Sequence, residues 1–328
     1  MRGLFVALSA LVAVLFAASL LTGPADLPAA GSLRGLVFGG DGPVPIVMRE
    51  IRLPRAILGL AVGAGLGLTG AALQGYLRNP LAEPGLLGIS GTAALGAVLA
   101  LQTGLSLAAV LTLPAFALTG AALGVGLLVV MAGPRGGSVT LILAGVALSA
   151  LAGAGTSLVL NLSPNPYAVN EIVFWLMGSL ADRSMLHVWL ALPPMAAGAA
   201  LILTTGRALD ALTLGEAAAQ SLGLAGPALR WRLVAGTALV VGPATAVAGA
   251  IGFVGLVVPH VLRPLTGARP SVLLPASALG GAALLLAADI AVRLIVPDRD
   301  LKLGVLTAIL GAPLFLHLIW KTRSGGRV

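Results

Sequence analysis

Residues 51–90 read IRLPRAILGLAVGAGLGLTGAALQGYLRNPLAEPGLLGIS, and this stretch decides how the rest of the chain is interpreted. It begins with two basic residues, Arg52 and Arg55, and then carries no charge across residues 56–77. A helix of that length spans the roughly 30 Å hydrocarbon core of a bilayer. Pro80 ends the run. The stretch therefore predicts a transmembrane helix with a basic entrance and a sharp turn at its other end.

Small residues recur every four positions along this predicted helix, at Gly59, Gly63, Gly67, Ala71 and Gly75. Residues four apart share one face of a helix. Small side chains on one face let neighbouring helices approach backbone to backbone. We therefore expect this helix to be buried among other membrane helices.

The overall composition places the whole chain in a membrane. Of its 328 residues, 58% are hydrophobic and 9% are charged, and the mean hydropathy is +1.06. Apolar spans recur from end to end, which predicts one polytopic, all-α transmembrane domain over residues 1–328. The net charge of +8 comes from basic residues in short loops. In that setting they are expected to set topology and meet lipid headgroups, not nucleic acid.

Ten spans are predicted, at residues 4–21, 56–77, 85–101, 107–131, 139–160, 188–205, 233–247, 251–262, 272–296 and 303–320. The first resembles a signal peptide, but its 18 apolar residues exceed the usual length and no A-x-A site follows, so we interpret it as a retained helix. The loop at 161–184 is expected to carry a short interfacial helix, because Phe174 and Trp175 suit the headgroup level.

The distribution of charge predicts the orientation. Ten spans put both termini on one side, and that side holds 11 of the 19 basic residues. Because lysine and arginine are enriched in cytoplasmic loops, both termini are predicted to be cytoplasmic. Eight basic residues remain outside, which is many for short loops and predicts that some of them have a function there.

The segment 207–232, on the predicted cytoplasmic side, is the longest stretch that cannot span. Thr213 and Glu216 have the spacing of a capping box, and Gly223 suits a C-cap. These features predict a helix at residues 214–222. A short helix in such a loop is suited to dock into a groove of a soluble partner. The alternative is a helix that only lies at the membrane interface.

The sequence does not support catalysis or nucleotide binding. Gly65, Gly67 and Gly70 spell GxGxxG, but they lie inside an apolar helical run and lack the strand and acidic residue of a dinucleotide site. No P-loop motif occurs, and no Ser/His/Asp arrangement or carboxylate cluster nominates an enzyme. The chain has no cysteine, and its three histidines, His187, His260 and His317, are far apart in the sequence. No metal site is therefore expected.

Asp289 and Arg293 lie one helical turn apart near the outer end of the predicted span 272–296. An ion pair at this spacing lowers the cost of placing either charge near lipid, which predicts a structural role for Asp289. Arg293 is expected to face the outside, at the same surface as Arg52 and Arg55.

With these features in place, the chain resembles the FecCD family, the permease subunits of ABC importers. The resemblance covers nearly the whole chain in the family's order. The matching stretches are IRLPR (51–55), QGYLRNPLAEPGLLGIS (74–90), LILAGVAL (141–148), FWLMGSL (174–180), LTLGEAAAQSLG (212–223), GAIGFVGLVVPHVLR (249–263), LLPASALGGAALLLAADIAVR (273–293) and GAPLFL (311–316).

The resemblance implies a type II ABC importer permease fold of about ten helices. It implies a second copy of the chain, two ABC ATPase subunits and an extracytoplasmic substrate-binding protein as partners, with ATP and Mg on the ATPases and no cofactor on this chain. The implied sites are binding-protein docking at Arg52, Arg55 and Arg293, ATPase coupling at Thr213, Leu214, Gly215, Glu216, Ala217, Leu222 and Gly223, and an inner gate at Ser138 and Val139. One departure is Lys302, where the family usually has proline.

The implied function is ATP-driven import of a metal chelate across the cytoplasmic (inner) membrane, by a chain that is not itself an enzyme. An iron-siderophore is the first choice of cargo, and vitamin B12 or haem are the alternatives. The residues alone leave open a secondary transporter or a channel that is not coupled to ATP. Such a transporter normally carries an ionisable residue deep in a span.

Overall fold

The computed structural model describes residues 1–25, 27–40, 42–107, 109–133, 136–224, 226–295 and 301–323. Every regular element in these ranges is helical, which confirms the all-α prediction. The helices in chain order are α1 (Arg2–Leu21), α2 (Ala29–Phe38), α3 (Pro43–Ile46), a π-helical segment (Val47–Arg52), α4 (Leu53–Leu77), α5 (Ile89–Gln102), α6 (Thr112–Ala132), α7 (Ser138–Asn161), α8 (Pro166–Leu176), α9 (Met185–Leu203), α10 (Gly206–Thr213), α11 (Glu216–Ser221), α12 (Pro227–Ala248), α13 (Val254–Leu262), α14 (Pro270–Ile295) and α15 (Leu303–Arg323).

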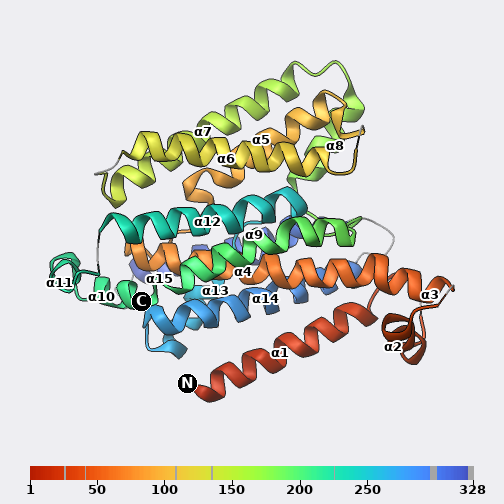
Figure 1. The fold of residues 1–328 in the computed structure, drawn as a ribbon, viewed down its shortest axis with the longest axis horizontal. Coiled ribbons are helices and arrows are strands. Elements are labelled where there is room, and N and C mark those ends of the chain that lie inside the picture. The colour runs from red at the N-terminus through yellow and green to blue at the C-terminus, as the bar shows by residue number, and fades with distance from the viewer. Residues whose placement is uncertain are drawn as a thin grey trace.

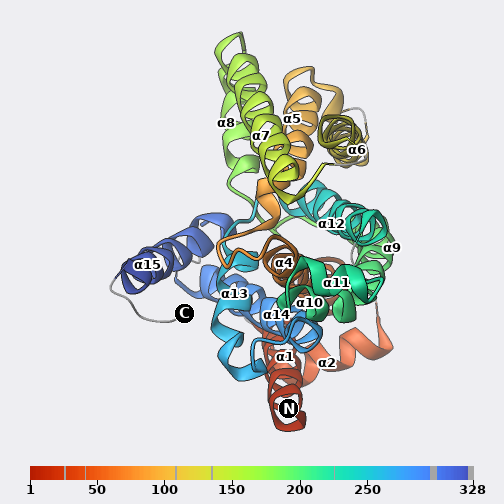
Figure 2. The same cartoon turned by 90° about the vertical axis from the view of Figure 1, so that its left-hand side faces the viewer.

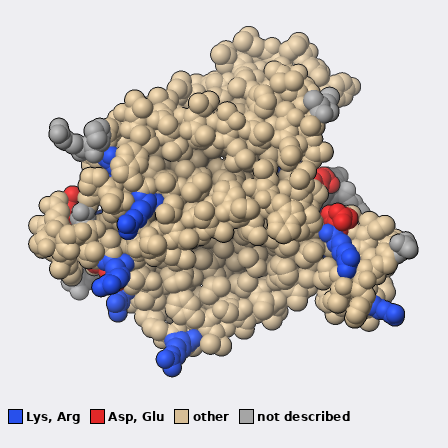
Figure 3. All heavy atoms as spheres, viewed as in Figure 1, with Lys and Arg blue, Asp and Glu red and all other residues tan. Residues whose placement is uncertain are grey.

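Seven of the described helices are long and apolar enough to cross a membrane: α1, the continuous run Pro43–Leu77 that ends in α4, α6, α7, α9, α12 and α14. Of the remaining three predicted spans, two coincide with shorter helices, α5 and α13, and the third coincides with α15, which has 21 residues. On the face shown in Figure 3, charged side chains lie mainly toward the two ends, and the surface between them is largely uncharged. This distribution fits a protein whose middle lies in hydrocarbon.

Helix α4 lies at the centre of the bundle and packs against α9, α12, α13 and α14 (Figure 2). Its small residues allow this close packing. A side chain at Gly63 would meet the carbonyl oxygen of Gly281 on α14, and one at Gly281 would meet that of Gly63. A side chain at Gly67 would meet the carbonyl oxygen of Ser277. The predicted small-residue stripe therefore meets α14 backbone to backbone at Gly63 and Gly67, whereas Gly75 is half-buried and less closely packed.

The two ends of the bundle carry different elements (Figure 1). The start of α1, the end of α6 and helices α10 and α11 lie at one end, which we call the α11 end. Helices α2, α3 and α8 lie at the other, which we call the α2 end. The described residues next to the predicted cytoplasmic turn, at the end of α6 and the start of α7, thus share one end of the molecule with α10 and α11.

The segment after α4 differs from the prediction. Instead of a span that starts at residue 85, a short 3₁₀ turn (Pro84–Leu87) precedes Gly88, whose φ of 76° separates the turn from α5. A side chain added at Gly255 would meet both Pro84 and the carbonyl oxygen of Leu66 in the middle of α4. The chain therefore folds back into the bundle, because Pro84 and Gly88 do not permit a continuous helix there.

Candidate functional site

Arg52 is held at the C-terminal end of α1, not exposed at the surface. Its guanidinium donates hydrogen bonds to the carbonyl oxygens of Leu20 at 3.1 Å, Leu21 at 2.9 Å and Ala25 at 2.6 Å. The residue is 4% exposed. The last carbonyls of a helix have no partner within the helix and carry its negative dipole end, so a cation is a favourable partner there.

Arg293 binds the same helix end from α14. It donates hydrogen bonds to the carbonyl oxygens of Ser19 at 2.9 Å and Thr22 at 2.6 Å, and to the Ser19 hydroxyl at 2.7 Å. Its Nη2 also lies 2.8 Å from Asp289, one turn earlier. Arg52 and Arg293, with the five carbonyl oxygens they bind at residues 19–25, form what we call the α1 clamp.

Arg55 completes the cluster through Asp289. Its Nη2 and its Nε both lie 2.9 Å from Oδ1 of Asp289, so the guanidinium binds the carboxylate through two nitrogens. The Asp289 side chain is 1% exposed. Its carboxylate forms ion pairs with two arginines, Arg55 on α4 and Arg293 on α14. Among these three arginines, Arg55 has the most accessible side chain, at 18%.

The geometric expectation that all three arginines face the outer surface is wrong for Arg52 and Arg293. Both guanidiniums instead donate hydrogen bonds to carbonyl oxygens at the end of α1. The same chemistry recurs at the α2 end: Arg49 donates to the carbonyls of Leu36 and Val37 at the end of α2, and Arg183 donates to that of Val247 at the end of α12. Burial lowers the pKa of Arg183, an effect that Asp182 opposes. Helix capping therefore accounts for four of the eight basic residues predicted to lie outside.

The predicted coupling helix is shorter than expected, and its cap is different. Helix α11 begins at Glu216, with Gly215 before it at a φ of 107°. Thr213 ends α10 and bonds back to the carbonyl of Asp210, so the capping box between Thr213 and Glu216 is wrong. An L-residue rarely adopts the conformation of Gly215.

The other end of α11 agrees with the prediction. Gly223 has a φ of 67°, and its N–H donates to the carbonyl of Gln220, while the N–H of Leu224 donates to that of Ala219. This pair of bonds is a Schellman motif, for which glycine is the favoured residue. Most of α11 faces outward: Ala219 is its buried residue, and Leu214 and Leu222 on its flanks are exposed.

The predicted inner gate lies where α7 starts. Ser138 is the first residue of α7 and Val139, next to it, is exposed. The turn before them is held by Arg230 of α12, which donates hydrogen bonds to the carbonyls of Gly133, at 2.6 Å, and Gly136. Ser138 also borders a pocket of about 350 Å³ that Glu216 and Arg230 line. A gating role for Ser138 and Val139 stays a prediction.

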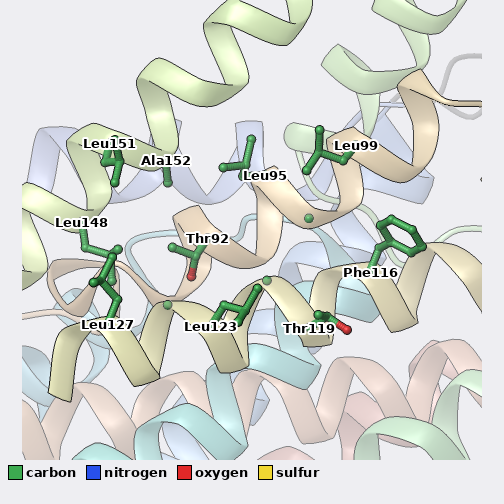
Figure 4. A pocket seen from close by; sticks show the side chains of 13 residues that line it. Thr92, Leu95, Leu99, Phe116, Thr119, Leu123, Leu127, Leu148, Leu151 and Ala152 are labelled. Carbon is green, nitrogen blue, oxygen red and sulfur yellow. The ribbon is translucent and has the colours of Figure 1, made fainter. Parts of the chain in front are cut away.

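A second pocket, of about 380 Å³, lies between α5, α6 and α7 and is almost wholly apolar (Figure 4). Its hydroxyl groups are already bonded within their own helices, Thr92 to the carbonyls of Gly88 and Ile89, and Thr119 to that of Ala115. The pocket therefore offers no convergent polar groups to a metal chelate.

Sequence reasoning missed several polar contacts inside the bundle. Gln74 of α4 accepts a hydrogen bond at 2.6 Å from Arg263 at the end of α13. Glu83 lies beside the backbone of Phe253, in the folded-back segment and not in a loop at the end of the bundle. Lys302 directly precedes α15, and its ammonium lies 5.3 Å from the centre of the Phe174 ring. The sequence shows that these residues are polar or charged, but it does not show which residues they contact.

These features define a class: a polytopic helical membrane protein with an apolar centre and a capped helical element projecting at one end. The chain belongs to the FecCD transport family, whose model matches residues 11–321. This membership identifies it as a transporter permease and confirms the resemblance found from the sequence motifs.

Two curated relatives and one solved structure show the extent of the similarity. The Fe(3+) dicitrate transport system permease protein FecD of Escherichia coli is 44% identical over 84% of this chain and 86% of its own. The vitamin B12 import system permease protein BtuC of Vibrio cholerae is 43% identical over 82% and 81%. A structure described as an inward-facing conformation of a metal-chelate type ABC transporter matches with a TM-score of 0.85 and 32% identity over 98% of this chain and 99% of that one. The type II ABC importer permease fold is thereby confirmed.

Proposed function

We propose that this chain is the membrane-spanning subunit of an ATP-driven importer that moves a metal chelate inward, with an iron-siderophore as the first candidate cargo. The observation that carries the proposal is the match of nearly the entire chain, in sequence and in fold, to permeases of this kind. Relatives named for iron dicitrate and for vitamin B12 match about equally well. Vitamin B12 and haem therefore remain the alternative cargoes.

We assign the proposed partners to the two ends of the bundle. A second copy of the chain would complete the transport path, and two ABC ATPases carrying ATP and Mg would dock at the α11 end. A substrate-binding protein would dock at the α2 end, near Arg55. On this proposal the α11 end and both termini are cytoplasmic, and the protein resides in the cytoplasmic (inner) membrane.

The rival function is a secondary transporter or channel. Carboxylates at bundle depth are the usual coupling groups of such proteins. Asp289 is bound by two arginines, which favours a structural role over proton or ion coupling.

Reconstitution tests the proposal directly. The permease would be co-expressed with the P-loop ATPase encoded beside it, purified, and placed in vesicles with the neighbouring binding protein. We expect copurification of the ATPase, and uptake of an iron-siderophore that requires both ATP and the binding protein. Uptake driven by an ion gradient without ATP would overturn the proposal. Parallel assays with vitamin B12 and haem decide the cargo.

A further inference from the structure

Of the two short helices at the α11 end, α10 is bound to the bundle through the start of α14. Helix α10 is fixed in place: Asp210 accepts a hydrogen bond at 2.8 Å from the N–H of Ser271 at the start of α14, and Arg269 lies 3.9 Å from its other carboxylate oxygen. Gly206 packs against Ser271 as well. Helix α10 is therefore attached to α14, which is packed against the central helix.

Helix α11 instead continues into α12. The connection contains Gly223 and Gly226, at φ values of 67° and 138°, and a side chain added at either position would meet nothing within 4 Å. Pro227 then starts α12. The covalent route from α11 thus leads through an exposed link to the first turn of α12, which carries Arg230.

Arg230 connects this first turn to the turn between α6 and α7. The residue is 4% exposed, and its guanidinium binds the carbonyls of Gly133 and Gly136 on either side of that turn. Two charge-assisted bonds from one planar group fix direction as well as distance. Arg230, Glu216 and Ser138 at the start of α7 all line the same pocket of about 350 Å³.

We propose that Arg230 is the positioning residue that transmits movement of α11, through α12, to the α6–α7 turn and hence to the start of α7. This inference rests on the proposed function, because it assumes that an ATPase moves α11. It adds a specific connection: the coupling element acts on the gate through the carbonyls of Gly133 and Gly136.

The test follows the start of α7 while ATP binds. The chain has no cysteine, so Thr140→Cys, at an exposed position in the first turn of α7, provides one spin label per copy. The distance between the two labels in the reconstituted complex is measured with and without ATP. We compare the otherwise native protein with Arg230→Met, Arg230→Lys and the matched control Arg232→Met, which alters an exposed arginine on the same helix.

Without Arg230, the ATPase should bind and hydrolyse ATP at the wild-type rate, while the ATP-dependent distance change disappears and transport falls roughly tenfold or more. Arg230→Lys keeps the charge but loses the planar fork. It should therefore fold, show a broadened distance distribution and consume more ATP per substrate. Arg232→Met should match the native protein.

Two outcomes overturn the proposal. A native ATP-dependent distance change in Arg230→Met shows that the turn is moved by another route. If Arg230→Met does not fold, native coupling and a narrow distance distribution in Arg230→Lys lead to the same conclusion. If the protein with intact Arg230 fails to bind an ATPase, the proposed function itself is wrong, and the inference falls with it.

Discussion

Arg55 and Asp289 lie 234 residues apart in the chain and form a 2.9 Å ion pair that joins α4 to α14. This pair leaves Arg55 partly accessible at the α2 end, whereas Arg52 and Arg293 are used in the α1 clamp. Of the three arginines that were predicted to dock a binding protein, Arg55 is the most accessible, so the docking proposal now rests on this residue.

The first prediction concerns that docking. Arg55→Gln should slow association of the binding protein roughly tenfold at low ionic strength and less at high salt, because steering by charge is screened. Gln is preferable to Glu, which would place a second carboxylate beside Asp289. Stopped-flow association kinetics measure the effect, with Arg49→Gln as the control. Equal association rates for Arg55→Gln and the native protein at low salt would show that Arg55 has no docking role.

The second prediction concerns the α1 clamp. Arg52→Gln should lower the free energy of unfolding by roughly 1.5–3 kcal/mol, the range for hydrogen bonds to charged groups. It should also raise the reactivity of a cysteine introduced at Thr22, which is otherwise held by the clamp. Thermal melting in detergent and thiol labelling measure the two effects. If Arg52→Gln slows docking and leaves stability unchanged, the arginine belongs to the docking surface after all.

The third prediction concerns Asp289. Asp289→Asn removes the counter-charge of two arginines at once, and breaking a buried pair typically costs roughly 3–5 kcal/mol. We expect a strongly destabilised protein, measured by its melting temperature and by its yield after extraction. A double variant, Asp289→Asn with Arg55→Gln, should recover part of the loss because one unpaired cation is removed. No recovery would argue against an ionic origin.

The fourth prediction concerns packing. Gly67→Ala should destabilise the bundle by roughly 1–3 kcal/mol, because the added methyl group meets the carbonyl oxygen of Ser277. Gly75→Ala is the matched control on the same stripe, where the nearest atom would be Leu209 at 3.7 Å. Equal melting temperatures for the two variants would mean that α4 and α14 are not packed as described.

The fifth prediction concerns α11. Gly215→Val should disrupt the start of the helix, because a β-branched residue is strained at a φ of 107°. It should therefore abolish ATPase association. Glu216→Pro should keep the helix, since proline fits the first helical position. Copurification measures both, and the reverse pattern would restore the predicted capping box between Thr213 and Glu216.

The sequence predicted features that repeat or that belong to one local motif. The four-residue spacing of Gly59, Gly63 and Gly67 identified the packing face of α4 before its partner was known. Gly223 identified the end of α11, because a Schellman motif uses neighbouring residues only. The short helix α8 and the seven described helices that are long and apolar enough to span a membrane were likewise visible as local patterns of apolar and turn residues. Helices α5 and α13 are shorter than the spans predicted there.

Contacts between distant residues were not predictable in this way. The partners of Arg52 and Arg293 are backbone carbonyls of α1, and a carbonyl leaves no trace in a sequence. The capping box failed for a related reason: Thr213 has the correct spacing, but its hydroxyl binds the carbonyl of Asp210 instead. The residue that could have indicated the true start of α11 is Gly215, which directly precedes the helix.

The two arginines of the α1 clamp are made at very different times during translation. Helix α1 gains Arg52 as a partner only 32 residues after Leu20, whereas Arg293 is made a further 241 residues after Arg52. At roughly 5–20 residues per second, translation takes roughly 12–48 s to cover that interval. During this time the end of α1 is bound by one of its two arginines, so a chain released before residue 293 has an incompletely held α1.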